Sequence, residues 1–600
     1  MNNATPGGGQ SHPNQNAANS TNYAPHLPKT VTLANPKRRL GCVSLAFLAI
    51  MTFYSARLID LQLIKGPSNA LAAQNSRIET RNLPALRGSF TDINGVVLAS
   101  SMKSRHITAD QTKIKRPEVT ANLLLRYLKI PKKQLVASLT GDRQYAYVAK
   151  RVPMATWRKI SDLGIAGIFS DPATTRVYPS GSLAASILGY VGDEGRGLGG
   201  LEEYLDKRLT GIDGKSTVEQ VKGREIPTSE KQTVASKDGL SVRLTIDADL
   251  QGMAERSLAR EAKKAGAKSG NVVVMDPATG NILAMATYPT FNPNKPFKSN
   301  DLAKQNRAVT ETFEPGSTSK IMTMAAVIEE GALNPKSKMI IPSGIPRGGT
   351  TFHDHDPHGT LRLTLNGVLA KSSNIGSIMA SEKIGQDKFL TYLQKFGVGE
   401  PTGLNFPGES SGSLPRPGDG TWSGTTFPTL AFGQGLSVTA LQVASVYATI
   451  ANNGVRLEPR LVAGYTDDQG NFIENERVPG VRVVSAKTAK TVRTMLESVV
   501  SANGTAPGAQ IPGYRIAGKT GTANKYTSSG GYSGYTASFV GIAPADKPEL
   551  VVSVIMQNPV NGHYGAIVSA PVFKQVTEYA LAHFKIPPSA SKRPTLPVTW

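Results

Sequence analysis

The chain has 600 residues, a formal net charge of +23 and a pI near 9.8, and 39% of its residues are hydrophobic. This length exceeds one ordinary hydrophobic core, so we expect at least two folded domains. The positive charge favours acidic partners such as anionic lipid or wall polymer. No nucleic-acid partner is expected, because the sequence has no zinc-finger, basic-zipper or RNP-like pattern.

The first 57 residues predict a tail followed by a membrane anchor. Residues 1–39 are polar, lack acidic groups and end in three basic residues, so we expect a disordered tail. Residues 40–57 are uncharged up to Arg57, and about 17 such residues are just enough to span a bilayer. A cleaved signal peptide has a similar pattern, but we favour an uncleaved anchor because apolar residues continue beyond Arg57. The basic flank places the tail in the cytoplasm and everything after the anchor outside.

Cys42 is the single cysteine of the chain and lies in this apolar run. One cysteine excludes an internal disulfide framework and any cysteine-rich metal site. We expect Cys42 to be packed and chemically inert.

Residues 58–235 mix short strands, turns and helices, which predicts a mixed α/β domain. The dipeptide Asn94-Gly95 lies between short apolar runs, a pattern typical of a β-hairpin. Farther on, Gly195–Gly200 precedes a helical pattern over Leu201–Leu205. These glycines lack the spacing of a phosphate-binding loop.

From about residue 238 the pattern becomes that of an α+β domain, in which an antiparallel sheet is flanked by helices. Apolar runs at 272–276 and 282–286 are joined by the turn Pro277–Gly280, which predicts an antiparallel pair. The other predicted elements are strands at 242–246, 538–542 and 550–556 and helices at 249–265 and 570–584.

The first chemical motif is Ser317-Thr318-Ser319-Lys320, which opens a helical pattern after Pro315-Gly316. Residues three apart share a helix face, so Lys320 can reach the Ser317 hydroxyl. A serine becomes nucleophilic when a base takes its proton, and a lysine is such a base if burial or neighbouring cations lower its pKa. The helix N-terminus also directs backbone N–H groups at the attacked carbonyl.

The second motif is Ser372-Ser373-Asn374. A hydroxyl here can relay a proton between Lys320 and a leaving amine, and an amide can hold a substrate peptide. The alternative is a loop in which Ser373 or Asn374 only caps the following helix.

The third motif is Lys519-Thr520-Gly521-Thr522. On an edge strand, such residues bind an extended peptide by strand addition. Lys519 and Thr520 would meet the terminal carboxylate of that peptide, and Gly521 would permit close approach.

A nucleotide-binding hypothesis rests on the same segment, because residues 513–520 match the pattern G-x4-G-K-[ST]. A P-loop follows a strand and opens a helix, whereas residues 521–534 are rich in glycine, serine and threonine. The predicted topology also places this segment outside the cell. We therefore expect no nucleotide and no other cofactor.

His353, His355 and His358 alternate with aspartates in a short run that could ligate a divalent metal. Ligands packed so closely, without an element to orient them, are more typical of a solvated loop. The solvated loop is the favoured interpretation, without a metal, and a metal site is the alternative.

The order S-x-x-K, S-x-N, K-T-G resembles the signature of penicillin-binding proteins and serine β-lactamases. Other segments resemble class B penicillin-binding proteins, with Phe90 and Ile93 departing from the usual residues of the first. These segments are Arg87-Gly88, Asp92, Asn94-Gly95 and Leu98-Ala99; Arg176, Tyr178-Pro179 and Gly181; Gly197–Leu205; Thr245-Ile246-Asp247; Asp276-Pro277 and Thr279-Gly280; Asn306-Arg307-Ala308; and Phe432-Gly433-Gln434-Gly435. The resemblance runs from about residue 57 to about residue 585. It is greatest to the FtsI-type septal enzyme, with the elongation-type enzyme as the close alternative.

The resemblance implies an extracytoplasmic pedestal domain at 58–235 and a penicillin-binding transpeptidase domain at 238–600. Ser317 would attack the penultimate D-Ala carbonyl of a peptidoglycan stem peptide, expel D-Ala and pass the acyl group to a neighbouring stem. By the same resemblance, Lys320 would be the acylation base and Ser372 the proton relay. Asn374 would bind the amide on the acyl side, and Lys519, Thr520 and Thr522 would bind the carboxylate. The N–H groups of Ser317 and Thr522 would form the oxyanion hole.

The implied partners are β-lactam antibiotics, which would acylate Ser317, a glycosyltransferase of the FtsW kind and other division proteins. The expected location is the cell membrane, as a single-pass protein. A carboxypeptidase, a β-lactamase or a β-lactam sensor of the same fold is an alternative. A non-catalytic division scaffold would need a broken motif, and all three motifs are intact.

Overall fold

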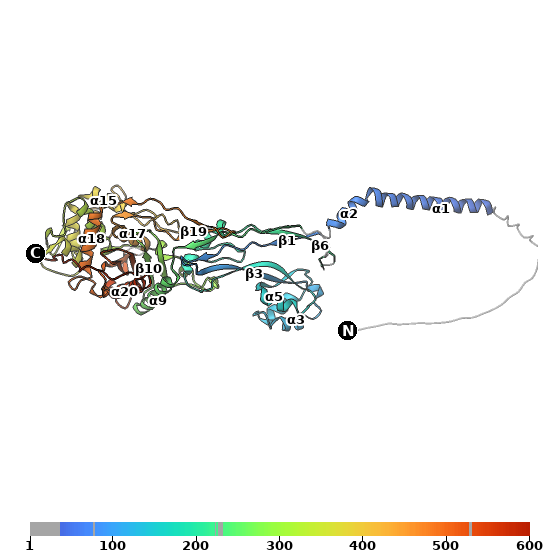
Figure 1. Ribbon diagram of the computed structural model, residues 1–600, viewed down its shortest axis with the longest axis horizontal. Helices are drawn as coiled ribbons and strands as arrows, with labels where there is room; N and C mark the ends of the chain where they lie inside the picture. The colour runs from blue at the N-terminus through green and yellow to red at the C-terminus, as the bar shows by residue number, and fades with distance from the viewer. Residues whose placement is uncertain (1–35, 76–77, 222–223, 226–231, 527–530) are drawn as a thin grey trace, which may run out of the picture. The chain divides into compact units, whose positions relative to one another are not determined.

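The computed structural model describes residues 36–75, 78–221, 224–225, 232–526 and 531–600. The described residues form two units, one within Met1–Glu79 and Val218–Glu230 and the other within Thr80–Thr217 and Lys231–Trp600 (Figure 1). Most of the predicted disordered tail lies outside the described residues. The first described helix begins within that predicted tail, at Pro36.

The smaller unit contains the predicted anchor. Helix α1 (Pro36–Ile59) leads through a π-helical turn at Asp60–Ile64 to α2 (Gly66–Asn75). By length and composition, Pro36–Ile64 is sufficient to cross a membrane. No residue of Pro36–Ile59 is buried, and Cys42 is exposed with the rest. The expectation that Cys42 is packed is therefore wrong, because an isolated apolar helix exposes all of its faces.

A five-stranded antiparallel sheet forms the centre of the region that carries the three motifs. Its strand order is β11 (Ile282–Tyr288), β10 (Ser269–Met275), β24 (Leu550–Gln557), β23 (Tyr532–Ala543) and β22 (Ala517–Tyr526). Val273 pairs with Met285, which confirms the predicted antiparallel pair. Successive side chains of a strand point to opposite faces, so Val272 and Val274 enter one core and Val273 and Met275 the other.

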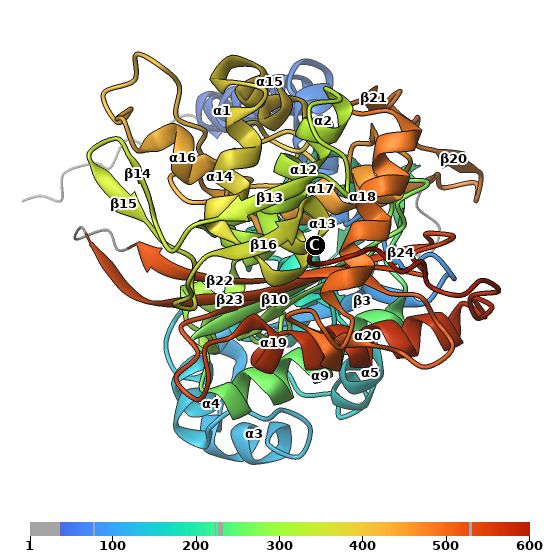
Figure 2. The same cartoon turned by 90° about the vertical axis from the view of Figure 1, so that its left-hand side faces the viewer.

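Helices cover both faces of this sheet (Figure 2). Helices α9 (Ala248–Ala265) and α20 (Ala570–His583) pack together on one face, and α17 (Ala440–Ala451) packs on the other. The predicted helices at 249–265 and 570–584 are confirmed to within one residue. Apolar strands buried on both faces explain why these runs do not alternate with polar residues.

Further helices and two small sheets lie on the α17 side of the main sheet. The helices are α12 (Lys320–Glu329), α13 (Leu365–Lys371), α14 (Asn374–Glu382), α15 (Gln386–Lys395), α16 (Thr426–Leu430) and α18 (Ala486–Val499). The small sheets pair β13 (Lys338–Ile341) with β16 (Leu361–Thr364) and β14 (Ile345–Arg347) with β15 (Thr350–Phe352).

The region Thr80–Thr217 is joined to the motif-bearing region by a shared sheet. Strands β2 (Phe90–Thr91) and β3 (Val97–Ala109) pair antiparallel, which confirms the predicted hairpin. Strand β2 also runs parallel to β9 (Ser241–Leu244), which pairs with β19 (Val462–Thr466). The region also contains β4 (Ala146–Pro153), β5 (Ile168–Val177), α3 (Pro117–Leu124), α4 (Lys132–Leu139), α5 (Met154–Ser161), α6 (Ala185–Leu188), α7 (Gly200–Tyr204) and α8 (Asp206–Leu209).

A buried ion network connects three of the family-like segments. Glu202 is fully buried and accepts from Arg87 Nε at 2.6 Å, from Arg176 Nε at 2.7 Å and from the Tyr178 hydroxyl at 3.1 Å. Arg87 also donates to Asp206 at 2.7 Å. Buried charges of this kind require paired, hydrogen-bonded partners, so each segment fixes the other two.

Candidate active site

Ser317 lies in a short 3₁₀ turn, Gly316–Ser319, that runs directly into α12. Gly316 has a φ of +53°, and its N–H donates to the Gly433 carbonyl at 2.9 Å. A Cβ at Gly433 would lie 2.2 Å from the Gly316 oxygen, so both glycines are needed for this close approach. The buried Tyr447 hydroxyl donates to the Thr318 carbonyl at 3.0 Å and holds the turn from the α17 side.

Lys320 is fully buried, and its Nζ lies 3.1 Å from Ser317 Oγ. The same Nζ lies 2.6 Å from the Ser372 carbonyl and 2.7 Å from Asn374 Oδ1. Burial lowers the pKa of Lys320 from 10.5 to about 7, while the Asp354 carboxylate acts in the opposite direction. A neutral amine is therefore available near pH 7 to take the Ser317 proton.

Ser372 connects the first motif to the third. It ends α13 in the left-handed region, with a φ of +62°. Its Oγ lies 2.9 Å from Ser317 Oγ and accepts from Lys519 Nζ at 2.9 Å. Because a serine in this backbone region costs roughly 1–2 kcal/mol, the surrounding contacts must hold Ser372 in place.

The other two residues of the second motif have different contacts. Ser373 caps α14, since its Oγ accepts from the Gly376 N–H at 2.9 Å. Asn374 is the first residue of α14 and directs its amide oxygen at Lys320. Ser373 therefore caps the helix, as the alternative interpretation expected, whereas the Asn374 side chain points into the site.

The third motif lies on β22, which is the edge strand of the five-stranded sheet, as predicted. The residues after Lys519 continue as a strand to Tyr526, so the P-loop hypothesis, which requires a helix there, is wrong. Lys519 is fully buried, and burial together with the Lys320 charge holds its pKa well below the usual value. Thr520 Oγ1 lies 3.0 Å from Thr505 Oγ1, and Thr522 Oγ1 accepts from the Gly565 N–H at 3.3 Å.

Gly521 permits a close approach within the protein itself. A Cβ at this position would lie 2.2 Å from Ser538 Oγ and 3.0 Å from Thr318 Cγ2. Ser538 lies on the neighbouring strand, and Thr318 lies in the nucleophile turn. The missing side chain therefore lets the edge strand pack directly against the turn that carries Ser317.

The three motifs open onto one cavity of about 830 Å³, a size that suits a peptide-like ligand. Residues of all three motifs line it, and Lys320 and Lys519 lie buried behind this lining. On one side the ring of His563 stacks on the ring of Tyr535, with 4.4 Å between the ring centroids, and its centroid lies 4.3 Å from that of Tyr564. The lining includes Ser317, Ser372, Asn374, Thr520, Thr522, Asp354, Gln434, Thr505, Asn524 and Thr599.

Asp354 is a site residue whose position the sequence did not reveal. Its Oδ1 accepts from the N–H groups of Asn374 and Ile375 at 2.5 and 2.9 Å, and its Oδ2 accepts from Ser373 Oγ at 2.6 Å. His358 Nε2 lies 3.0 Å from the same carboxylate. Asp354 therefore fixes the start of α14 and with it the second motif. The sequence showed only an aspartate among histidines, with no sign of these partners.

The three histidines do not converge as metal ligands. His353 contacts the Ser343 carbonyl at 2.8 Å, His355 the Tyr564 hydroxyl at 3.4 Å, and His358 pairs with Asp354. The solvated-loop interpretation fits these separate partners better than the metal-site alternative.

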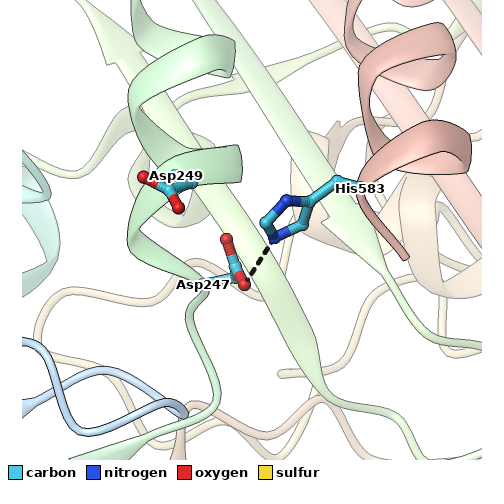
Figure 3. Close-up of side chains that lie close together, drawn as sticks. All are labelled: Asp247, Asp249 and His583. Carbon is cyan, nitrogen blue, oxygen red and sulfur yellow. Dashed lines mark hydrogen bonds and ion pairs between the residues drawn. The ribbon is translucent and has the colours of Figure 1, made fainter. Parts of the chain in front are cut away.

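Asp247, Asp249 and His583 lie close enough together to hold a metal ion, within the part of the chain that the structure describes (Figure 3). The Asp247 carboxylate already accepts from the Leu250 N–H at 2.9 Å and from Asn94 Nδ2 and His583 Nε2 at 3.0 Å each. These bonds cap α9 and connect it to α20, which accounts for the placement of Asp247 and His583 without an ion.

Two family models match this chain. Residues 82–244 match the Penicillin-binding Protein dimerisation domain, and residues 270–578 match the Penicillin binding protein transpeptidase domain.

Similar proteins cover nearly the whole chain. It is 36% identical over 594 residues to penicillin-binding protein PbpB of Mycolicibacterium smegmatis, covering 92% of this chain and 91% of that protein. It is 33% identical over 560 residues to peptidoglycan D,D-transpeptidase FtsI of Escherichia coli, covering 92% of each. The crystal structure of penicillin-binding protein 3 from Mycobacterium tuberculosis with aztreonam covers 86% of this chain and all of its own, with 34% identity and a TM-score of 0.69.

The buried lysine beside a serine, joined to a second serine and to an edge strand, defines a serine acyltransferase site. Together with the two family matches, it shows that the chain belongs to the class B penicillin-binding proteins.

Proposed function

We propose that this chain is a peptidoglycan D,D-transpeptidase that cross-links stem peptides during septal wall synthesis through an acyl-enzyme at Ser317. The observation that carries the proposal is the buried Lys320, with a pKa of about 7 and its Nζ 3.1 Å from Ser317 Oγ. The names of the two relatives, penicillin-binding protein PbpB and peptidoglycan D,D-transpeptidase FtsI, support this activity, and the septal assignment follows the resemblance to the FtsI-type enzyme.

Acylation begins when Ser317 Oγ attacks the carbonyl carbon of the penultimate D-Ala. The serine proton passes to neutral Lys320 as the new C–O bond forms, and the N–H groups of Ser317 and Thr522 stabilise the oxyanion. The C–N bond to the terminal D-Ala then breaks. Ser372 donates its proton to the leaving amine and is reprotonated from the Lys320 ammonium. The contacts of Ser372 with Ser317 and Lys320 support this relay.

Substrate binding uses the edge strand and the second motif. Lys519, Thr520 and Thr522 bind the terminal carboxylate, and Asn374 binds the amide on the acyl side. The edge position of β22 supports strand addition by an extended stem peptide, with Gly521 keeping the strand against the nucleophile turn. An amine of a second stem then attacks the ester carbonyl and passes a proton to Lys320. The C–O bond to Ser317 breaks, and the Lys320 ammonium returns the proton to Ser317 Oγ.

The proposed organisation divides the chain into a cytoplasmic tail (1–39), an anchor (40–57), a pedestal domain (58–235) and an extracytoplasmic transpeptidase domain (238–600). The basic flank of the apolar helix supports this orientation. The proposed partners are a glycosyltransferase of the FtsW kind and other division proteins, through the anchor and pedestal. Aztreonam and ampicillin in solved structures of the Mycobacterium tuberculosis relative support β-lactam acylation of Ser317 here.

Covalent labelling by a fluorescent penicillin tests the proposal. The parent and a Ser299→Ala control, which removes a hydroxyl outside the cavity, should form a gel-stable adduct, and Ser317→Ala should form none. Release of D-Ala from a pentapeptide that ends in D-Ala-D-Ala should follow the same pattern. A folded parent that takes no label would refute the acyl-transfer function.

A further inference from the structure

Residues 595–600, which we call the strap, lie along the small sheet that precedes α13. Thr599 pairs with Leu363 in an antiparallel bridge, the Thr364 N–H donates to the Val598 carbonyl at 3.0 Å, and the Trp600 N–H donates to the Arg362 carbonyl at 3.4 Å. The strap therefore adds to the exposed edge of β16. Figure 2 places the end of the strap beside α13 and β16.

The strap also closes the first turn of α13. Thr364 caps this helix by accepting from the Gly367 N–H, and its hydroxyl donates to the Pro597 carbonyl at 2.5 Å. Asn366, which is fully buried, donates from Nδ2 to the same carbonyl at 3.2 Å. A Cβ at Gly367 would lie 1.9 Å from the Val598 oxygen. Only a glycine at this position lets the strap backbone lie flat on the helix.

Trp600 holds the end of the strap in place. Its indole Nε1 donates to the Leu363 carbonyl at 3.1 Å. Lys338 Nζ lies 4.7 Å from the centroid of the Trp600 ring, and the guanidinium carbon of Arg362 lies 5.1 Å from the same centroid. Two cations over one ring, together with the indole bond, anchor the strap to both strands of the small sheet.

The helix held in this way ends at the reacting atoms. Helix α13 has seven residues, and Ser372 follows it directly. The hydrogen bonds of Ser372 to Ser317 and Lys519 depend on where that helix ends. Thr599 of the strap also lines the same cavity as Ser317.

We propose that the strap is a positioning element for the transpeptidase reaction, which fixes α13 so that Ser372 stays within hydrogen-bond distance of Ser317, and that it contributes Thr599 to the wall of the substrate cavity. This inference rests on the proposed function, because its effect is on acylation. A displacement of about 1 Å in such a group costs up to about a hundredfold in rate.

The test is the second-order rate of acylation by a fluorescent penicillin in the full chain and in variants. Gly367→Ala places a methyl group where the strap lies but favours the helix itself, so it displaces the strap selectively. We expect this variant, and a chain ending at residue 594, to acylate about ten- to a hundredfold more slowly than the parent. Gly420→Ala is the matched control, because a Cβ there has no neighbour within 4 Å.

Two further measurements separate positioning from general stability. In the chain ending at residue 594, adding Gly367→Ala should change the rate by less than about twofold, because the group that it displaces is already gone. A synthetic peptide of sequence TLPVTW should restore acylation to the shortened chain, and TLPVTA should restore less. If the shortened chain does not fold, the rates of Gly367→Ala and Trp600→Ala decide the question.

Faster hydrogen exchange of the α13 amides in Gly367→Ala than in the parent would show that the strap is displaced. If that variant then acylates at the parent rate, the inference is overturned. A parent that takes no label would instead count against the proposed function. In that case, slower exchange of the α13 amides in the parent than in Gly367→Ala would still support the role of the strap in holding α13. Equal exchange in the two proteins would overturn that role.

Discussion

The acylation rate should depend on the protonation of Lys320. The drop in its pKa from 10.5 to about 7 corresponds to about 5 kcal/mol of differential destabilisation of the ammonium form in the folded protein. Only the neutral amine can take the Ser317 proton. The rate should therefore fall about tenfold for each pH unit below 7 and reach a plateau above it.

The assay is stopped-flow acylation by a fluorescent penicillin between about pH 5 and pH 9. Lys320→Arg provides the sharpest comparison, because a guanidinium stays protonated throughout this range. It should acylate about 10²- to 10⁴-fold more slowly than the parent on the plateau. His358→Gln is the control for a second titrating group near the cavity, and its profile should keep the parental inflection.

The same pKa gives a stability prediction of defined sign. The unfolded chain binds the Lys320 proton up to about pH 10.5 and the folded chain only up to about 7, so folding becomes more favourable as pH rises through this window. Between pH 7 and pH 9 the parent should gain about 2 kcal/mol of unfolding free energy relative to Lys320→Met, measured by urea denaturation. A flat acylation profile, or an inflection that disappears in His358→Gln, would refute the assignment of Lys320 as the base.

Asp354→Asn should slow acylation about tenfold, because an amide keeps only one acceptor oxygen, whereas the carboxylate uses both oxygens to hold the start of α14. It should also move the inflection of the pH profile to lower pH, because the carboxylate no longer favours the Lys320 ammonium, and an unmoved inflection would contradict that electrostatic link. Gly521→Ala should lower both Tm and the acylation rate, since its methyl group would lie 2.2 Å from Ser538 Oγ, and adding Ser538→Gly should restore part of both. Glu202→Gln should lower the free energy of unfolding by about 3 kcal/mol in urea, because two buried arginine contacts lose their countercharge, while the folded fraction keeps its acylation rate. A change below about 0.5 kcal/mol would mean that the buried network contributes little to stability.

Much of the fold was accessible from local pattern. The runs at 272–276 and 282–286 pair as expected, and α9 and α20, which cover one face of the sheet, begin and end within one residue of the prediction. These elements are long, keep one hydrophobic pattern from end to end and are bounded by turn residues, so their hydrophobic pattern identifies them. Cys42 shows the limit of such reasoning, because burial depends on what surrounds a helix and not on its composition.

The candidate site was accessible only in part. Motif spacing placed Lys320 one helical turn from Ser317, but the cause of its low pKa is burial by residues distant in the chain. The contacts of Asp354 with the second motif left no trace in the sequence, because they form between a loop and a helix start. Gly521 was expected to admit a substrate, whereas its close neighbours are Ser538 and Thr318.

The sequence by itself determined the order of three motifs, the apolar helix that precedes them and the strand and helix types that carry them. These properties depend on residues within about one helical turn or one strand of each other. The tertiary structure alone decided that Ser372 bridges Ser317 and Lys519, that Asp354 fixes the second motif and that residues 595–600 close the start of α13. Contacts between segments so far apart depend on how the sheets and helices pack, and local periodicity carries no information about that packing.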